Sequence, residues 1–133
     1  MEEKSYREAV LHYAAETYGT TPEYLWKRTP NYAVLRNQAS RKWYGAVIDI
    51  SRKTLGLPGE GIVDILDIKC SPVMIGSLLE QEGYLPAYHM NKNSWITVLL
   101  DGTVPLEQVK SLLDLSYQQT EPKPRKAKGR GEW

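Results

Sequence analysis

The feature that most constrains the fold is the way in which the predicted strands follow one another. Residues 32–37 and 42–50 are rich in apolar and aromatic side chains and are separated by a link of hairpin length. A third strand is predicted over 62–70 after a glycine-rich loop, and residues 87–91 and 94–100 form a second predicted hairpin. Strands joined by such short links run antiparallel, because a parallel pair needs a long crossover connection.

Helical periodicity occurs in the segments around these strands. Apolar residues at helical spacing predict helices over 3–18, 71–82 and 105–117, and a threonine followed by proline predicts a short helical turn over 21–26. The main elements then follow the order α-β-β-β-α-β-β-α. This order predicts an α+β fold, an antiparallel five-stranded sheet with helices packed on one face. The other face of the sheet is expected to be open to a partner.

Alternation along the strands predicts which side chains face the core. The set predicted to point inward comprises Tyr44, Ala46, Ile48 and Ile50 in the second strand and Leu66, Ile68 and Cys70 in the third. Asp67 and Lys69 of the third strand are predicted to point outward.

Charge is divided unevenly along the chain. Residues 1–120 hold 12 basic and 14 acidic side chains, whereas residues 121–133 hold five basic and two acidic ones among prolines and glycines. A segment with the second composition cannot offset the entropy that ordering would cost. The sequence therefore predicts a single domain over 1–120 and a disordered basic tail over 121–133.

Composition also bounds the class of protein. The chain has one cysteine and no apolar run near the ~20 residues that a membrane helix needs. Its start is too acidic for a signal peptide, so we expect a cytoplasmic protein. It has nine tyrosines, four tryptophans and no phenylalanine, and rings that carry a polar group suit a wet surface.

Few residues are arranged for catalysis or metal binding. His12 and His89 lie far apart in the sequence, and Cys70 has no partner at a ligand spacing. Asp64 and Asp67 are three residues apart in a predicted strand, so their carboxylates should point to opposite faces as solvated edge acids. We therefore expect no enzymatic activity, no metal and no cofactor.

Two stretches combine cations with tryptophan or tyrosine at predicted hairpins, SRKWYG (40–45) and YHMNKNSW (88–95). Cations contact phosphates and rings stack on bases, so this combination is typical of nucleic-acid surfaces. With a lysine from the neighbouring strand, the candidate nucleic-acid-binding residues are Arg41, Lys42, Trp43, Lys69, Tyr88, His89, Asn91, Lys92 and Trp95. The alternative is structural, because rings near hairpins often cap a core edge and lysine at a turn discourages edge pairing. The acidic excess in 1–120 also weighs against strong affinity for DNA.

The strings SRKWYGAV, VDILDIKCSP and LPAYHMNKNSWITVLLDGTVP resemble the MmcQ/YjbR family over roughly residues 30–118. The resemblance implies a fold like that of type III secretion chaperones and of the frataxin-like CyaY proteins. It also implies DNA binding through a double-wing arrangement of hairpins. The family's motif residues coincide with the candidate residues above, together with Cys70, whereas Ser71 departs from the acid that commonly follows that cysteine.

Two hypotheses from different classes follow. The first is a non-enzymatic DNA-binding protein that contacts phosphates through its basic, aromatic-rich hairpins. The alternative is a protein-interaction or small-ligand-binding module on a secretion-chaperone-like fold. The sequence leaves open whether the protein is a monomer or a homodimer.

Overall fold

The computed structural model describes residues 5–122, so the predicted basic tail lies outside the described residues from residue 123 onward. The elements in chain order are α1 (Tyr6–Tyr18), β1 (Ala33–Arg36), β2 (Trp43–Ser51), β3 (Ile62–Lys69), α2 (Pro72–Leu78), β4 (Tyr84–Pro86), β5 (Trp95–Leu99) and α3 (Leu106–Gln119). This order confirms the predicted α+β fold with an antiparallel five-stranded sheet.

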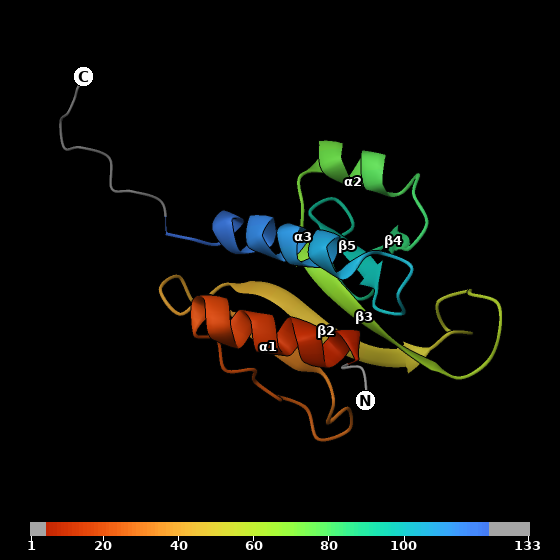
Figure 1. Cartoon of the computed structure of the whole chain (residues 1–133), viewed down its shortest axis with the longest axis horizontal. Coiled ribbons are helices and arrows are strands. Elements are labelled where there is room, and N and C mark those ends of the chain that lie inside the picture. The colour runs from red at the N-terminus through yellow and green to blue at the C-terminus, as the bar shows by residue number, and fades with distance from the viewer. Residues whose placement is uncertain (1–4, 123–133) are drawn as a thin grey trace.

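The strands form one sheet in the order β1-β2-β3-β5-β4, and every neighbouring pair is antiparallel. Helices α1 and α3 lie side by side across one face of this sheet (Figure 1). Helix α2 adds Ile75 and Leu78 to the core beneath them. All three helices therefore cover the same face, as the sequence predicts. Among residues 5–122, no helix has the length and apolar character to cross a membrane.

Local signals explain where the helices begin and end. The Ser5 hydroxyl accepts a hydrogen bond from the Glu8 amide at the start of α1, and Gly19 ends that helix in the left-handed region at φ 68°. Ser71 caps α2 in the same way, with a proline in its first turn. Helix α2 ends at Leu78, several residues before the predicted end at 82, because residues after it continue as turns toward Gly83.

The second strand does not bury one alternating set of residues, and the prediction of a common core face is wrong. The register between β1 and β2 shifts, so that Leu35 pairs with Gly45 while Arg36 pairs with Trp43. The extra residue, Tyr44, consequently turns into the core under the helices. The rest of the predicted set, Ala46, Ile48 and Ile50, faces the other side of the sheet.

That other side carries a second, smaller core, which differs from the expectation of an open face. Six buried apolar residues form it, namely Ala46, Ile48, Ile50, Val63, Ile65 and Leu99. Loop residues pack over them, including Tyr32, Leu55, Leu85 and Met90. Both faces of the sheet are thus covered, one by helices and one by loops.

Two predicted elements are loops in the structure. Residues 21–26 are not helical, because the Glu23 backbone bonds to the free edge of β1 at Val34, with N···O distances of 3.0 and 2.9 Å. Residues 87–91 are not a strand, because β4 ends at Pro86, which has no amide hydrogen to continue the ladder. Both loops contribute side chains to the second face of the sheet, Trp26 from the first loop and Tyr88 and Met90 from the second.

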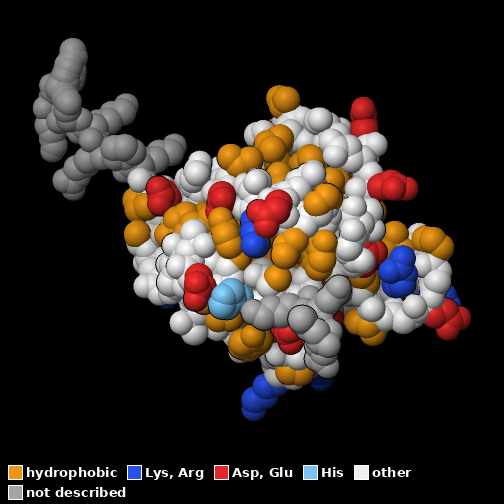
Figure 2. All heavy atoms as spheres, viewed as in Figure 1, with side chains coloured by type: hydrophobic (Ala, Val, Ile, Leu, Met, Phe, Trp, Pro, Cys, Tyr) orange, Lys and Arg blue, Asp and Glu red, His pale blue; other side chains and the backbone are white. Residues whose placement is uncertain are grey.

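The two sides of the molecule differ in surface character. Figure 2 views the helical side, where acidic side chains are spread among apolar ones and most of the basic side chains lie at the margins. This side offers little to a polyanion.

Candidate functional site

A pocket of about 310 Å³ lies on the second face of the sheet, opposite the helices. We call it the aromatic pocket; its lining comprises Trp26, Thr29, Tyr32, Val34, Trp43, Ala46, Ile48, His89 and Met90. Val34 and Ala46 are paired across β1 and β2, so they share this face and form part of the floor. The walls come from the loop before β1, the start of β2 and the loop after β4.

Three aromatic rings meet at the pocket wall. The ring of Trp26 stands edge-on to Trp43, with centroids 6.0 Å apart, and edge-on to Tyr32 at 6.1 Å. Edge-to-face packing of this kind restricts the orientation of the rings. Trp26 is 42% exposed, so part of its ring is available to a ligand.

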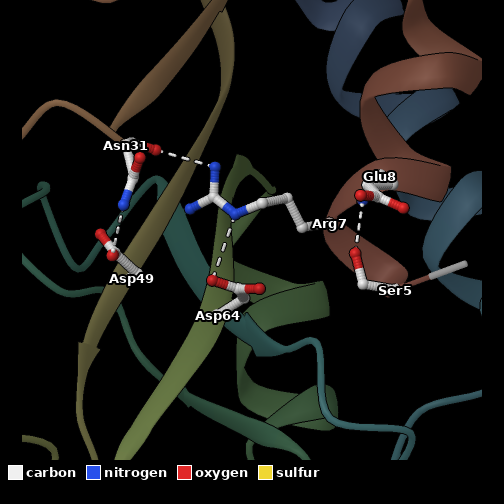
Figure 3. A network of polar contacts seen from close by, with 6 residues as sticks. All are labelled: Ser5, Arg7, Glu8, Asn31, Asp49 and Asp64. Carbon is white, nitrogen blue, oxygen red and sulfur yellow. Dashed lines mark hydrogen bonds and ion pairs between the residues drawn. The ribbon is translucent and has the colours of Figure 1, made fainter.

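The loop that carries Trp26 is anchored at its far end by a polar network (Figure 3). Arg7 of α1 donates to the Asn31 carbonyl at 2.8 Å and to a carboxylate oxygen of Asp64 at 3.2 Å. The Asn31 amide donates in turn to Asp49 of β2 at 3.1 Å. The network ties α1, the loop and two strands together beside the pocket.

Replacing Arg7 with methionine is expected to lower the free energy of unfolding by about 1–3 kcal/mol, because Asp64 and the Asn31 carbonyl lose their partner in a part-buried site. Urea denaturation would measure the loss. Lys110→Met is the control, since its ion pair with the exposed Glu107 and its ammonium 5.3 Å from the Tyr13 ring centroid are surface interactions that should together contribute at most about 1 kcal/mol. Equal stability of the two variants would contradict a structural role for the network.

The loop after β4 is held by a buried carboxylate. The Tyr88 amide donates to the Thr97 hydroxyl at 2.9 Å, and that hydroxyl donates to Asp67. Asp67 is fully buried and its second oxygen has no hydrogen-bond partner among the described residues. Burial raises the pKa of Asp67 to about 7, against the opposing effects of Thr97, the Tyr88 backbone and Lys92.

Five cations belong to the segments that supply the walls of the aromatic pocket; we call them the basic rim, and they are Lys27, Arg28, Arg41, Lys42 and Lys92. These three segments, 24–31, 38–43 and 86–94, contain no aspartate or glutamate. All five are exposed, and none forms an ion pair within residues 5–122. The remainder of residues 1–120 has seven basic and fourteen acidic side chains. Positive charge is therefore concentrated around the pocket.

Backbone conformation also singles out this region. Within residues 5–122, the non-glycine residues with positive φ are Arg41, at 67°, and His89, at 61°. Such conformations are uncommon outside glycine and persist where the surroundings enforce them. Arg41 belongs to the rim and His89 to the pocket wall.

Of the residues predicted from sequence, Trp43 and His89 line the aromatic pocket. Arg41 and Lys42 directly precede Trp43 in the chain, and Lys92 lines a second hollow that it shares with His89. Asn91 has a structural role, because its side-chain oxygen accepts from the Asn93 amide at 2.8 Å and shapes the turn. Tyr88 packs on the second core, with its ring 3.9 Å from that of His89.

The remaining two predicted residues pair with each other. Lys69 and Trp95 are neighbours across β3 and β5, with the ammonium 5.5 Å from the ring centroid. Trp95 is almost wholly buried, and neither residue lines the aromatic pocket. They lie at the base of the loop after β4.

Sequence reasoning missed the contribution of residues 24–31. Trp26, Lys27 and Arg28 repeat the juxtaposition of tryptophan and two cations seen in residues 41–43, and this signal was present in the sequence. The prediction of a helical turn over 21–26 left these three residues out of the candidate site. Asp67 was predicted as a solvated edge acid, which is wrong because the loop after β4 covers it.

Residues 5–122 contain no group of three His, Cys, Asp or Glu side chains placed to hold a metal ion. The Cys70 thiol is buried, and burial raises its pKa, which disfavours the reactive thiolate.

The fold and the pocket define a small α+β protein with a basic, aromatic concavity on the loop-covered side of its sheet. The YjbR family model matches residues 15–119, and the chain belongs to this family. The uncharacterized protein YyaQ of Bacillus subtilis is 40% identical over 114 residues, which span 86% of this chain and 97% of that protein. The uncharacterized protein YjbR of Escherichia coli is 42% identical over 55 residues, 41% of this chain and 47% of that protein.

Solved structures agree with the fold. A crystal structure of a Pseudomonas syringae protein superposes with a TM-score of 0.84 at 41% identity and covers 86% of this chain and 98% of that one. A Deinococcus radiodurans protein has a TM-score of 0.66 at 22% identity, over 95% of this chain and 86% of that one, and this similarity shows the fold alone.

Proposed function

We propose that this YjbR-family protein is a non-enzymatic DNA-binding protein that docks on phosphates through the basic rim. The observation that carries the proposal is the segregation of charge. Five exposed cations and no acid occupy the three segments around the pocket, while the rest of residues 1–120 is strongly acidic. Phosphate contacts by lysine and arginine supply most of the affinity for DNA, so this is the surface of residues 5–122 best suited to face the polyanion.

The acidic excess in the rest of residues 1–120 should also orient the protein as it approaches DNA. An acidic helical side is repelled by DNA, and a basic rim on the other side is attracted, so encounters are steered into one orientation. A near-zero net charge is compatible with binding when the cations are gathered in this way. Cytoplasmic location belongs to the same proposal.

Absence of catalysis is also part of the proposal. Cys70 is buried under the helices with a raised pKa, and His12 lies on the exposed side of α1, 3.8 Å from Glu16. His89 is on the other side of the sheet from both. These residues offer no shared nucleophile and base.

Fluorescence anisotropy with a labelled DNA duplex tests the proposal. Up to five phosphate contacts predict that the logarithm of the binding constant falls with the logarithm of salt concentration with a slope of about −3 to −5. Between about 50 and 200 mM salt, affinity should then drop on the order of 10²- to 10³-fold. No binding at the lower salt concentration, or binding that does not respond to salt, would contradict the proposal.

A small-ligand-binding module is the second candidate, and the apolar lining of the aromatic pocket favours it. Its volume of about 310 Å³ is at the lower end of the range of small-molecule sites, roughly 300–1,000 Å³. Salt-independent heat of binding when free indole is titrated into the protein in a calorimeter, in a protein that does not bind DNA, would favour this candidate.

A further inference from the structure

We infer that the aromatic pocket accepts an unpaired nucleobase, so that the protein prefers single-stranded DNA to a duplex. This inference rests on the proposed function and names the form of DNA that the site recognises. It concerns the pocket, whereas the proposed function concerns the rim.

The pocket has the size and lining for one flat ring system. Its volume of about 310 Å³ is small for a ligand site, and its walls are tryptophan, tyrosine, histidine and methionine over a floor of aliphatic side chains. Aromatic side chains bind bases by stacking, which every base offers through its ring face. An apolar lining provides few hydrogen-bond partners for the edges of a base, so we expect the affinity to depend only weakly on which base is bound.

The rings are already oriented for this role. Trp26 makes T-shaped contacts with Trp43 and Tyr32, at interplanar angles of 72° and 74°. The two neighbours restrict rotation of the Trp26 ring, while the residue as a whole stays 42% exposed. Because the ring is already ordered in the free protein, little further conformational entropy of this side chain is lost when a base stacks on it.

The cations lie where the backbone of a bound strand would pass. Lys27 and Arg28 directly follow Trp26 in the chain, and Arg41 and Lys42 directly precede Trp43. Each of these two tryptophans of the pocket wall therefore has two cations next to it in the chain. Proteins that bind single strands combine such a positive track with stacking rings.

A paired base cannot use the pocket without cost. In a duplex each base is stacked on both sides, and extruding it costs a few kcal/mol of lost stacking and pairing. A single strand avoids this cost. The rim can hold either form through its phosphates, but only an unpaired base gains the additional stacking.

Three probes of one length, about 15 nucleotides, separate phosphate contacts from base contacts: a labelled single strand, the same strand in a duplex, and a strand with abasic sites in place of its central bases. Each is titrated with the wild type, Trp26→Ala and the control Tyr24→Ala. Tyr24 is 53% exposed in the same loop and does not line the pocket. Because Trp26 and Tyr24 are both exposed, the variants should fold, which circular dichroism checks.

The wild type should bind the single strand more tightly than the duplex or the abasic strand. Trp26→Ala should weaken single-strand binding by roughly 5- to 150-fold, the loss expected for one stacked base, and should leave duplex and abasic-strand binding nearly unchanged. Tyr24→Ala should behave as the wild type on all three probes.

Two results would overturn the inference while leaving the proposed function intact: equal wild-type affinity for the three probes, or an equal loss on all three in Trp26→Ala. Failure of every probe to bind at about 50 mM salt would overturn the proposed function itself, and the inference with it. The two failures are therefore distinguishable in one set of titrations.

Discussion

Neutralising three cations of the basic rim should lower DNA affinity on the order of 10³-fold at about 50 mM salt. The variant combines Lys27→Gln, Arg28→Gln and Lys42→Gln, which change exposed side chains outside both cores. Each phosphate contact that is lost removes about 0.9 from the salt slope, so the slope should become shallower by about three. Anisotropy titrations with a duplex at several salt concentrations measure both quantities.

The control for this variant is Lys53→Gln. Lys53 is an exposed cation in the loop between β2 and β3, at the opposite end of β2 from Arg41 and Lys42. Its removal should leave affinity and salt slope close to those of the wild type. If the triple variant keeps the wild-type salt slope, DNA does not dock on the rim.

Replacing Asp67 with asparagine should raise the free energy of unfolding at about pH 8 by up to about 4 kcal/mol relative to the wild type. Burial makes the ionised carboxylate unfavourable, and this is the main reason that its pKa is raised from 3.8 to about 7. Asparagine has nearly the same shape, can accept the Thr97 hydrogen bond and carries no charge. The variant should match the wild type below about pH 3, where the carboxyl is protonated in both the folded and the unfolded chain.

The direction of the pH dependence follows from the order of the two pKa values. Between about pH 4 and pH 7 the unfolded chain releases the Asp67 proton while the folded chain keeps it. The contribution of Asp67 to stability therefore falls as pH rises through this window and levels off above the folded pKa. Urea denaturation at several pH values gives the difference between variant and wild type, which cancels the titration of other groups.

Glu60→Gln is the control for Asp67→Asn, because it also removes one carboxylate but at an exposed loop position. Its stability should stay close to that of the wild type, because the side chain lies at the surface. A pH-independent difference for Asp67→Asn would show that Asp67 does not carry its proton into the folded state at neutral pH.

Much of the fold could be predicted because it depends on local signals. Short links between apolar segments require antiparallel pairing, and Ser5, Gly19 and Ser71 mark helix ends through their own caps. The direction of Tyr44 could not be predicted. It depends on a register shift between β1 and β2, which is a property of two strands and not of one.

The candidate site was only partly predictable for a related reason. Residues 41–43 and 88–92 were identified because a cation and a ring are adjacent in the sequence. The sequence predicts a helical turn over 21–26, since nothing local shows that the free edge of β1 would hold Glu23 in an extended conformation. Lys69 and Trp95 were grouped with the site by composition, but they satisfy each other across the sheet.

The sequence by itself determined the fold class, the antiparallel sheet and the presence of cations beside polar-tipped rings, because turn length, periodicity and adjacency are properties of neighbouring residues. Only the tertiary structure decided that three separate segments meet around one pocket and that Asp67 is buried beneath one of them. Those facts depend on contacts between residues far apart in the chain. The small net charge of the protein consequently conceals five cations in the basic rim, an acidic excess in the rest of residues 1–120 and a basic excess in residues 121–133.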